Sequence, residues 1–186
     1  MSTAIVVRGT GISATIDHHG AEPVAIRDED GHDYLWSGDD PWKRHAPILF
    51  PTICRVPDDR IRVGDRTYPM PQHGFARDLS WSVVDTAHDL ASFVLVADDR
   101  TREHYPFDFA LAVTYTAHER SLTTQYTVEN RGAEPMPFSL GSHPAFVWPL
   151  EDDSPRSTHD IVFDEPETAG FRRVEENLLT ADVYDN

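Results

Sequence analysis

The chain has 186 residues, enough for one domain with a sizeable core, and 39% of them are hydrophobic. Thirty-two acidic residues oppose 16 lysines and arginines, and this net charge of -16 argues against binding to nucleic acid or to an anionic membrane surface, since both require clustered basic residues. The single cysteine, Cys54, excludes an internal disulfide. We expect a soluble cytoplasmic protein, because the N-terminus does not resemble a leader and no apolar run could span a bilayer.

Strict alternation of apolar and polar residues runs through most of the chain and indicates β-strands. The clearest case is 107–115, where Phe, Phe, Leu, Val and Tyr occupy the odd positions. We predict strands at 11–17, 23–28, 60–63, 66–69, 80–85, 92–97, 107–115, 122–128, 137–140 and 160–164. Short helical turns are expected only within 35–43 and 169–179. The pattern therefore predicts an all-β protein, a large antiparallel β-sandwich formed by a single domain over residues 1–186.

Two short runs, 70 positions apart, each set a histidine in a turn beside aromatic residues. The first, Pro-Gln-His-Gly-Phe-Ala-Arg at 71–77, presents Gln72, His73 and Arg77 at its surface. In the second, Ser-Leu-Gly-Ser-His-Pro-Ala-Phe at 139–146, the proline restricts the backbone of His143 to extended conformations. Imidazole titrates near neutrality, so a positioned pair can give and take protons. Aromatic planes such as that of Phe146 suit the apolar C–H faces of a sugar.

Each of these residues also has a structural interpretation. From spacing alone, His73 and His143 are explained equally well as histidines that tie two loops together through backbone hydrogen bonds. Arg55 follows an apolar run and is a candidate for an arginine pointing into a cleft, although a salt bridge with an aspartate is slightly favoured. Arg77 faces the same choice because Asp78 is adjacent.

The sequence does not support metal binding, catalysis by a serine nucleophile or nucleotide binding. The remaining histidines lack metal-ligand spacing, apart from His18 and His19 in an apparent hairpin turn, so we predict no metal site. Ser142 and His143 are neighbours, and on a strand their side chains would point to opposite faces, which excludes a nucleophile–base pair. The chain has no glycine-rich phosphate loop, so nucleotide binding is not expected.

The two histidine runs resemble the aldose 1-epimerase (galactose mutarotase-like) family, in particular its bacterial branch of mutarotase homologues. The stretch 134–146 is the most specific part, and 45–51 is similar to the segment that precedes the family's arginine-bearing loop, with Arg55 at the arginine. Residues 105–130 are similar to the strand pair before the second histidine. The resemblance implies a β-supersandwich and the interconversion of the α and β anomers of an aldose, with no cofactor.

The resemblance also implies a mechanism. A carboxylate removes the proton of the C1 hydroxyl while an imidazolium protonates the ring oxygen, the ring opens, C1 rotates, and the steps reverse. By position, His143 takes the general-acid role and His73 hydrogen-bonds the sugar near its ring oxygen. The predicted substrate contacts are Arg55, Gln72, Arg77 and Phe146.

One part of the family pattern is missing. The general base is a glutamate in a C-terminal strand, and none of the late glutamates matches its motif: Glu151, Glu165, Glu167, Glu175 and Glu176. We therefore expect the chain to correspond to the N-terminal two-thirds of the family domain, as a fragment or as a shortened homologue with little activity.

The expected partner is a small sugar, an aldohexose or a hexose phosphate. Three functions stay open: an aldose 1-epimerase, a hexose-6-phosphate 1-epimerase with arginines on the phosphate, and a non-catalytic carbohydrate-binding module. The sequence does not give the oligomeric state, although open sheet edges would favour self-association.

Overall fold

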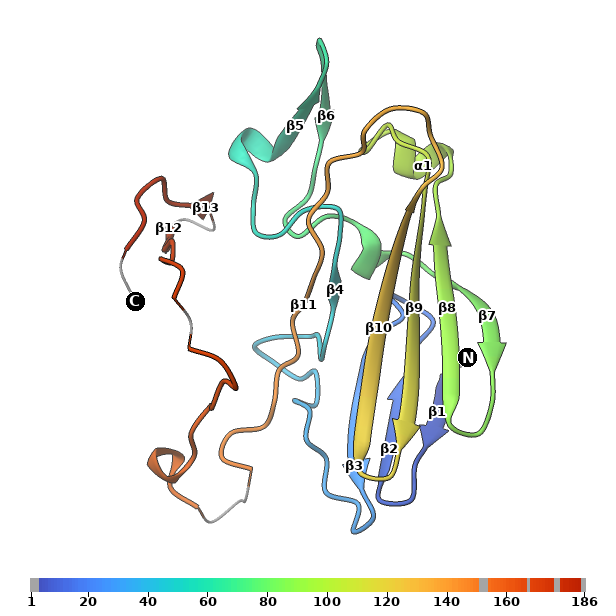
Figure 1. The fold of residues 1–186 in the computed structure, drawn as a ribbon, viewed down its shortest axis with the longest axis vertical. Coiled ribbons are helices and arrows are strands. Elements are labelled where there is room, and N and C mark those ends of the chain that lie inside the picture. The colour runs from blue at the N-terminus through green and yellow to red at the C-terminus, as the bar shows by residue number, and fades with distance from the viewer. Residues whose placement is uncertain (1–3, 151–153, 167, 176–177, 185–186) are drawn as a thin grey trace.

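A computed structural model describes residues 4–150, 154–166, 168–175 and 178–184, and each element of more than four residues in this part is a strand (Figure 1). All pairs between these strands are antiparallel. The expectation of an all-β antiparallel sandwich is therefore confirmed. No helix among the described residues is long and apolar enough to cross a membrane.

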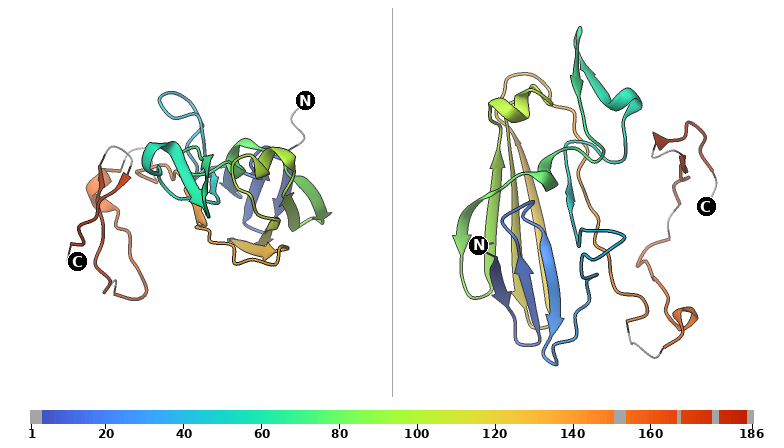
Figure 2. Two further views of the ribbon diagram at one scale, coloured as in Figure 1. Left: turned by 90° about the horizontal axis from the view of Figure 1, so that it is seen from above. Right: turned by 180° about the vertical axis from the view of Figure 1, so that it is seen from behind.

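Two sheets form the sandwich. The larger has the order β10-β9-β8-β7, with bounds Ser82–Thr86 (β7), Leu90–Val96 (β8), Phe109–His118 (β9) and Ser121–Asn130 (β10). The smaller has the order β1-β2-β3, with bounds Ile5–Arg8 (β1), Ile12–Ile16 (β2) and Pro23–Asp28 (β3). Figures 1 and 2 show the smaller sheet lying across one face of the larger one.

Shorter elements lie around the sandwich. Three further strand pairs are β4 (Ile48–Leu49) with β11 (Gly141–Ser142), β5 (Arg60–Val63) with β6 (Arg66–Pro69), and β12 (Val174–Glu175) with β13 (Leu178–Leu179). The short helices are η1 (Pro57–Asp59), η2 (Ala76–Asp78), α1 (Asp99–Arg102) and η3 (Arg156–Thr158). The β5–β6 hairpin projects from one end of the molecule, and the described residues after 154 lie to one side of the sandwich (Figure 1).

The alternation in β9 shows how the sequence forms the core. Leu111, Val113 and Tyr115 are fully buried between the sheets, and Phe93 of β8 packs edge-on against Tyr115. Burying each such side chain contributes about 1.5–3 kcal/mol relative to leaving it exposed. The Tyr115 hydroxyl donates to the carbonyl of Ala21 at 2.8 Å, which ties the small sheet to the large one.

The pair of β4 and β11 connects the two histidine runs to the sandwich. Ser142 of β11 pairs with Ile48 of β4. Phe50, directly after β4, is fully buried, and its carbonyl accepts from the amides of Phe75 and Ala76 at 3.0 and 3.2 Å. Both runs are thereby attached to the same two-residue strand.

The strand β1 and the short helices η1, η2, α1 and η3 were not predicted, and four of the predicted segments have a different structure. Residues 137–140 and 160–164 form no strand, and residues 35–43 form no helix. In 160–164 the residues Ile161, Val162 and Phe163 are at least 74% exposed, so no described element buries this apolar run. Pro41 and Gly38 interrupt any helix in 35–43. In 169–179 the short pair β12–β13 occurs in place of a helical turn.

Candidate active site

The turn that carries His73 is fixed by a reciprocal contact with Cys54. The amide of His73 donates to the Cys54 carbonyl at 2.9 Å, and the Cys54 amide donates to His73 Nδ1 at 3.0 Å. His73 has φ 67° and Gly74 has φ 72°, so two consecutive residues adopt the left-handed conformation. The imidazole is therefore held by its backbone and by one ring nitrogen.

The position of His143 is set by the segment before β4. The His143 amide donates to the Pro47 carbonyl at 3.1 Å, and the Ala145 amide donates to the His45 carbonyl at 2.8 Å. The side chain of His143 is not part of this pairing, and the residue is exposed. Its ring is thus presented on a fixed backbone.

The structure brings the two histidine rings together. The ring centroids of His73 and His143 are 6.2 Å apart at an interplanar angle of 70°, and the indole of Trp42 lies 5.3 Å from the His143 ring. The ring of His143 thus contacts the indole of Trp42 and the ring of His73. The ring of His73 also contacts the backbone amide of Cys54 and the carboxamide of Gln72. An acid and a second polar group can act on one small ligand from this arrangement.

The electrostatic environment favours neutral His73. Burial lowers its pKa below the ordinary value of 6.5, and the charges of Arg77, His143 and Arg44 lower it further. Because Nδ1 accepts the Cys54 amide, the proton of the neutral ring resides on Nε2. His73 is therefore a hydrogen-bond donor through Nε2 and a poor carrier of a second proton.

Gln72 and Arg77, both predicted from the sequence, lie with His73. The side-chain amide nitrogen of Gln72, Nε2, is placed 3.3 Å from His73 Nε2, and because the neutral ring donates through Nε2 the amide must be turned so that its Oε1 accepts that bond. Arg77 Nη2 donates to the backbone carbonyl of Gln72 at 2.7 Å. Asp78 forms ion pairs with Arg77 Nε at 3.7 Å and with Arg44 Nη2 at 2.6 Å. The two arginines beside His73 thus share one carboxylate.

Arg55 and Phe146 occupy different surroundings. Arg55 Nε and Nη2 each donate to a carboxylate oxygen of Asp59 at 2.6 Å, which is the kind of salt bridge that the sequence slightly favoured. Phe146 pairs with Leu35 in an isolated bridge and is 57% exposed. The roles of Arg55 and Phe146 toward a substrate stay predictions.

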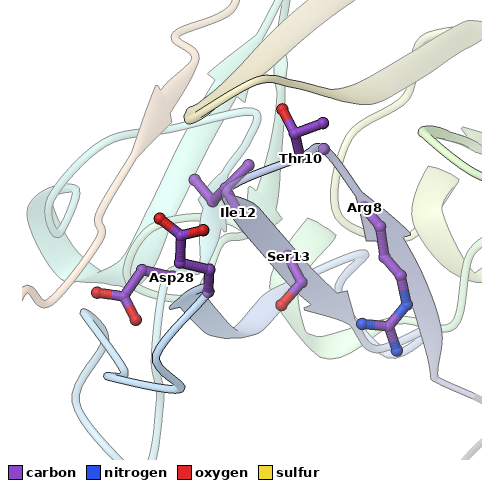
Figure 3. Close-up of a pocket in the computed structure, with 7 residues that line it drawn as sticks. Arg8, Thr10, Ile12, Ser13 and Asp28 are labelled. Carbon is purple, nitrogen blue, oxygen red and sulfur yellow. The ribbon is translucent and has the colours of Figure 1, made fainter.

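Sequence reasoning missed Trp42 and Arg44. Both line a cavity of about 430 Å³ together with Asp78 and Glu22, and Trp42 is the side chain that also contacts His143. The signal was present as an aromatic residue followed by two basic ones at 42–44, directly before the segment 45–51. A second, smaller hollow lies at the β1–β2 turn, lined by Arg8, Thr10, Ile12, Ser13 and Asp28 among others (Figure 3).

Of the five late glutamates, two lie in the described part of the chain. Glu165 and Glu175 are exposed, whereas Glu151, Glu167 and Glu176 lie outside the described residues. In the described part of the chain, no group of three or more His, Cys, Asp or Glu residues is placed to hold a metal ion.

The sequence pattern of the family described as aldose 1-epimerase matches residues 3–165. The chain belongs to the aldose 1-epimerase family. Within this family it is 31% identical over 159 residues to chromosomal protein LacX of Lactococcus lactis subsp. lactis, a match that covers 82% of this chain and 53% of LacX. The chain thus spans about half the length of this curated relative.

Solved structures agree with the family. A galactose mutarotase-like protein from Lactobacillus casei superposes with a TM-score of 0.85 at 35% identity, over 98% of this chain and 63% of the other. A galactose mutarotase related enzyme from Lactobacillus acidophilus gives the same TM-score and coverage at 25% identity. The family expectation and the mutarotase-like fold are therefore confirmed.

Proposed function

We propose that this chain contributes the acid side of an aldose 1-epimerase site, which interconverts the anomers of a hexose. The observation that carries the proposal is the approach of the His73 and His143 rings to 6.2 Å, from two runs far apart in the sequence. Such a pair offers two different groups to one small ligand: a proton donor and a neutral hydrogen-bond donor.

The environment of each ring supports a division of roles. His73 has a lowered pKa and its Nδ1 is occupied, so it suits hydrogen bonding to a sugar oxygen through Nε2–H. His143 is exposed on a fixed backbone, so it suits protonation of the ring oxygen. Its proton goes to that oxygen as the bond between C1 and the ring oxygen breaks, and the C1 hydroxyl gives its proton to a carboxylate as the aldehyde forms. The family resemblance assigns that carboxylate to a glutamate which no residue of this sequence matches.

A hexose phosphate is the second candidate substrate. Arg44 and Arg77 both act on His73 electrostatically, and they share the carboxylate of Asp78. Glu22 also acts electrostatically on Arg77 and lines the cavity beside Arg44, so a phosphoryl group near the histidine pair would be held by the two guanidinium groups as hydrogen-bond donors and not by an excess of positive charge. The strongly acidic composition of the chain opposes long-range attraction of such an anion.

Anomer-exchange NMR tests the proposal, with glucose, galactose and glucose 6-phosphate in a weakly catalytic buffer. Because no residue of this sequence matches the family's general base, we expect exchange only weakly above the buffer rate and a fall to the buffer rate in His143→Ala, since proton transfer from a positioned side chain contributes about 10²–10⁴-fold. The matched control is His88→Ala, at an exposed histidine in the β7–β8 turn, which should exchange like the wild type.

Exchange that persists in His143→Ala would overturn the role of this residue. Absence of exchange together with saturable sugar shifts would instead support a binding module, the function from a different class. A lower KM for glucose 6-phosphate than for glucose would favour the phosphorylated substrate.

A further inference from the structure

Glu22 is a buried carboxylate outside the pair of histidines. It lies between β2 and β3, is 7% exposed, and its Oε1 accepts the backbone amides of His45 and Ala46 at 2.6 and 2.7 Å. A buried carboxylate is stable only where hydrogen bonds replace its hydration. Bonds from amides to a charged oxygen are short and about twice as strong as neutral ones, so Glu22 fixes this segment firmly.

The same segment supports the backbone of His143. The carbonyl of His45 accepts from the amide of Ala145, and the carbonyl of Pro47 accepts from the amide of His143. The carboxylate of Glu22 therefore accepts the backbone amides of residues 45 and 46. The backbone carbonyls of residues 45 and 47 accept the amides of Ala145 and His143. Only main-chain atoms separate the carboxylate from the histidine backbone.

The other side of Glu22 is anchored in the core. The carbonyl of its neighbour Ala21 accepts from the hydroxyl of Tyr115, which is almost completely buried on β9. The backbone carbonyl of Glu22 accepts the amide of Asp17 across the β2–β3 turn at 2.9 Å. A continuous set of hydrogen bonds thus runs from the middle of the sandwich to His143.

We propose that Glu22 is a positioning residue for the general acid, which it holds in place through the main chain of residues 45–47. The proposal rests on the proposed function, because it assigns the orientation of His143 to this carboxylate. Both of the described amides that Glu22 accepts reach its Oε1, which also lies 3.9 Å from Nδ1 of His45. Loss of its oxygen leaves two buried amides unpaired and releases the segment that fixes His143.

The experiment compares Glu22→Ala, Glu22→Gln and a matched control, Asp28→Ala. Asp28 ends β3, the strand that Glu22 precedes, and its Oδ1 likewise accepts two backbone amides, those of Asp30 and His32 at 3.1 and 2.9 Å. The control therefore removes the same type of contact at the opposite end of one strand, together with a bond that Asp28 Oδ2 accepts from the Tyr34 hydroxyl at 2.9 Å. Three readouts are taken: the free energy of unfolding in urea, kcat and KM for anomer exchange, and the histidine ring resonances by NMR.

We expect Glu22→Ala to lower kcat about 10–100-fold with KM nearly unchanged, since a small misplacement of a catalytic group costs this much. The His143 ring resonance should shift or broaden in Glu22→Ala, and remain near the wild-type position in Glu22→Gln, which keeps an oxygen acceptor. Asp28→Ala should lower stability and leave kcat and the His143 resonance unchanged.

Equal loss of kcat in Glu22→Ala and Asp28→Ala would overturn the proposal, as would an unchanged His143 resonance in Glu22→Ala. If the wild type shows no exchange with any sugar, the proposed function fails, and the ring resonances still test the positioning role. In that case, a resonance perturbed in Glu22→Ala and restored in Glu22→Gln would support Glu22 as the residue that orients His143.

Discussion

The ring of His73 is held in one tautomer because the amide of Cys54 donates to its Nδ1. A second proton would have to displace this amide and would meet the charges of Arg77 and Arg44. Both effects act in the same direction as burial, which lowers the pKa of the imidazole. The residue therefore remains a neutral donor under conditions in which an ordinary histidine begins to charge.

This environment predicts how stability depends on pH. Because the pKa of His73 is lowered on folding, the unfolded chain binds a proton near pH 6.5 before the folded chain does. The free energy of unfolding should therefore fall as the pH drops below about 6.5. The loss from this residue should be a fraction of the about 1.4 kcal/mol that one pKa unit represents, since the ring is half-exposed.

His73→Asn isolates this contribution. Asparagine tolerates the left-handed conformation and its Oδ1 can accept the Cys54 amide, but it does not titrate. Urea unfolding at about pH 7.5 and pH 5.5 should give a smaller pH-dependent loss in His73→Asn than in the wild type. The exposed His88, changed to Asn, should leave the wild-type dependence intact. An identical loss in wild type and His73→Asn would contradict the assigned environment.

The sequence identified some of the site residues and missed others for a physical reason. His73, Gln72 and Arg77 lie in one run, so a turn was enough to place them together. The approach of His143 to His73 depends on β4 pairing with β11, a two-residue ladder without a periodic signal. The approach of the two histidines was therefore expected from the family resemblance, whereas their spacing in the sequence could not predict it.

At the scale of an element, the turn at 71–74 depends on Gly74. Its φ is 72°, and a Cβ there would fall against the carbonyl of Phe50, which accepts the amides of Phe75 and Ala76. We expect Gly74→Ala to destabilise the fold by about 2 kcal/mol or more, from backbone strain together with the displaced carbonyl. Anomer exchange should fall as well, since the turn carries His73.

Gly64 provides the control for backbone strain alone. Its φ is 58° in the β5–β6 turn and a Cβ there would meet nothing within 4 Å. Gly64→Ala should therefore cost only about 1 kcal/mol in urea unfolding and leave exchange unchanged. Equal losses in the two variants would mean that the Phe50 carbonyl does not constrain the turn.

Strands specified by a buried face or by a turn were predictable, and those suggested by apolar residues alone were not. The alternation in β9 and the hairpin of β5 and β6 matched the structure, because burial of one face or a Gly–Asp turn specified them. The segment 160–164 was also predicted as a strand, on a run of three apolar residues at 161–163, and formed none. Alternation indicates which face a strand could bury, and a strand forms only where another element covers that face.

At the scale of the whole molecule, two features of the surface have opposite effects on self-association. The net charge of -16 makes copies of the chain repel one another. Among the described residues, however, β10 is the last strand of its sheet, and its ten residues include neither lysine nor proline. Such an edge presents unpaired amides and carbonyls that can pair with another strand.

We therefore predict a salt-dependent self-association through β10. Raising the salt concentration from about 0.05 to 0.5 M shortens the range of the repulsion, so the sedimentation coefficient should increase with salt. Thr123→Lys, at an exposed position of β10, should suppress this increase, because a lysine on an edge strand opposes pairing. Ala87→Lys adds the same charge at the exposed β7–β8 turn and should associate at least as readily as the wild type. Equal suppression by both variants would contradict the proposed contact, whereas loss in Thr123→Lys alone would locate it at the edge of the larger sheet.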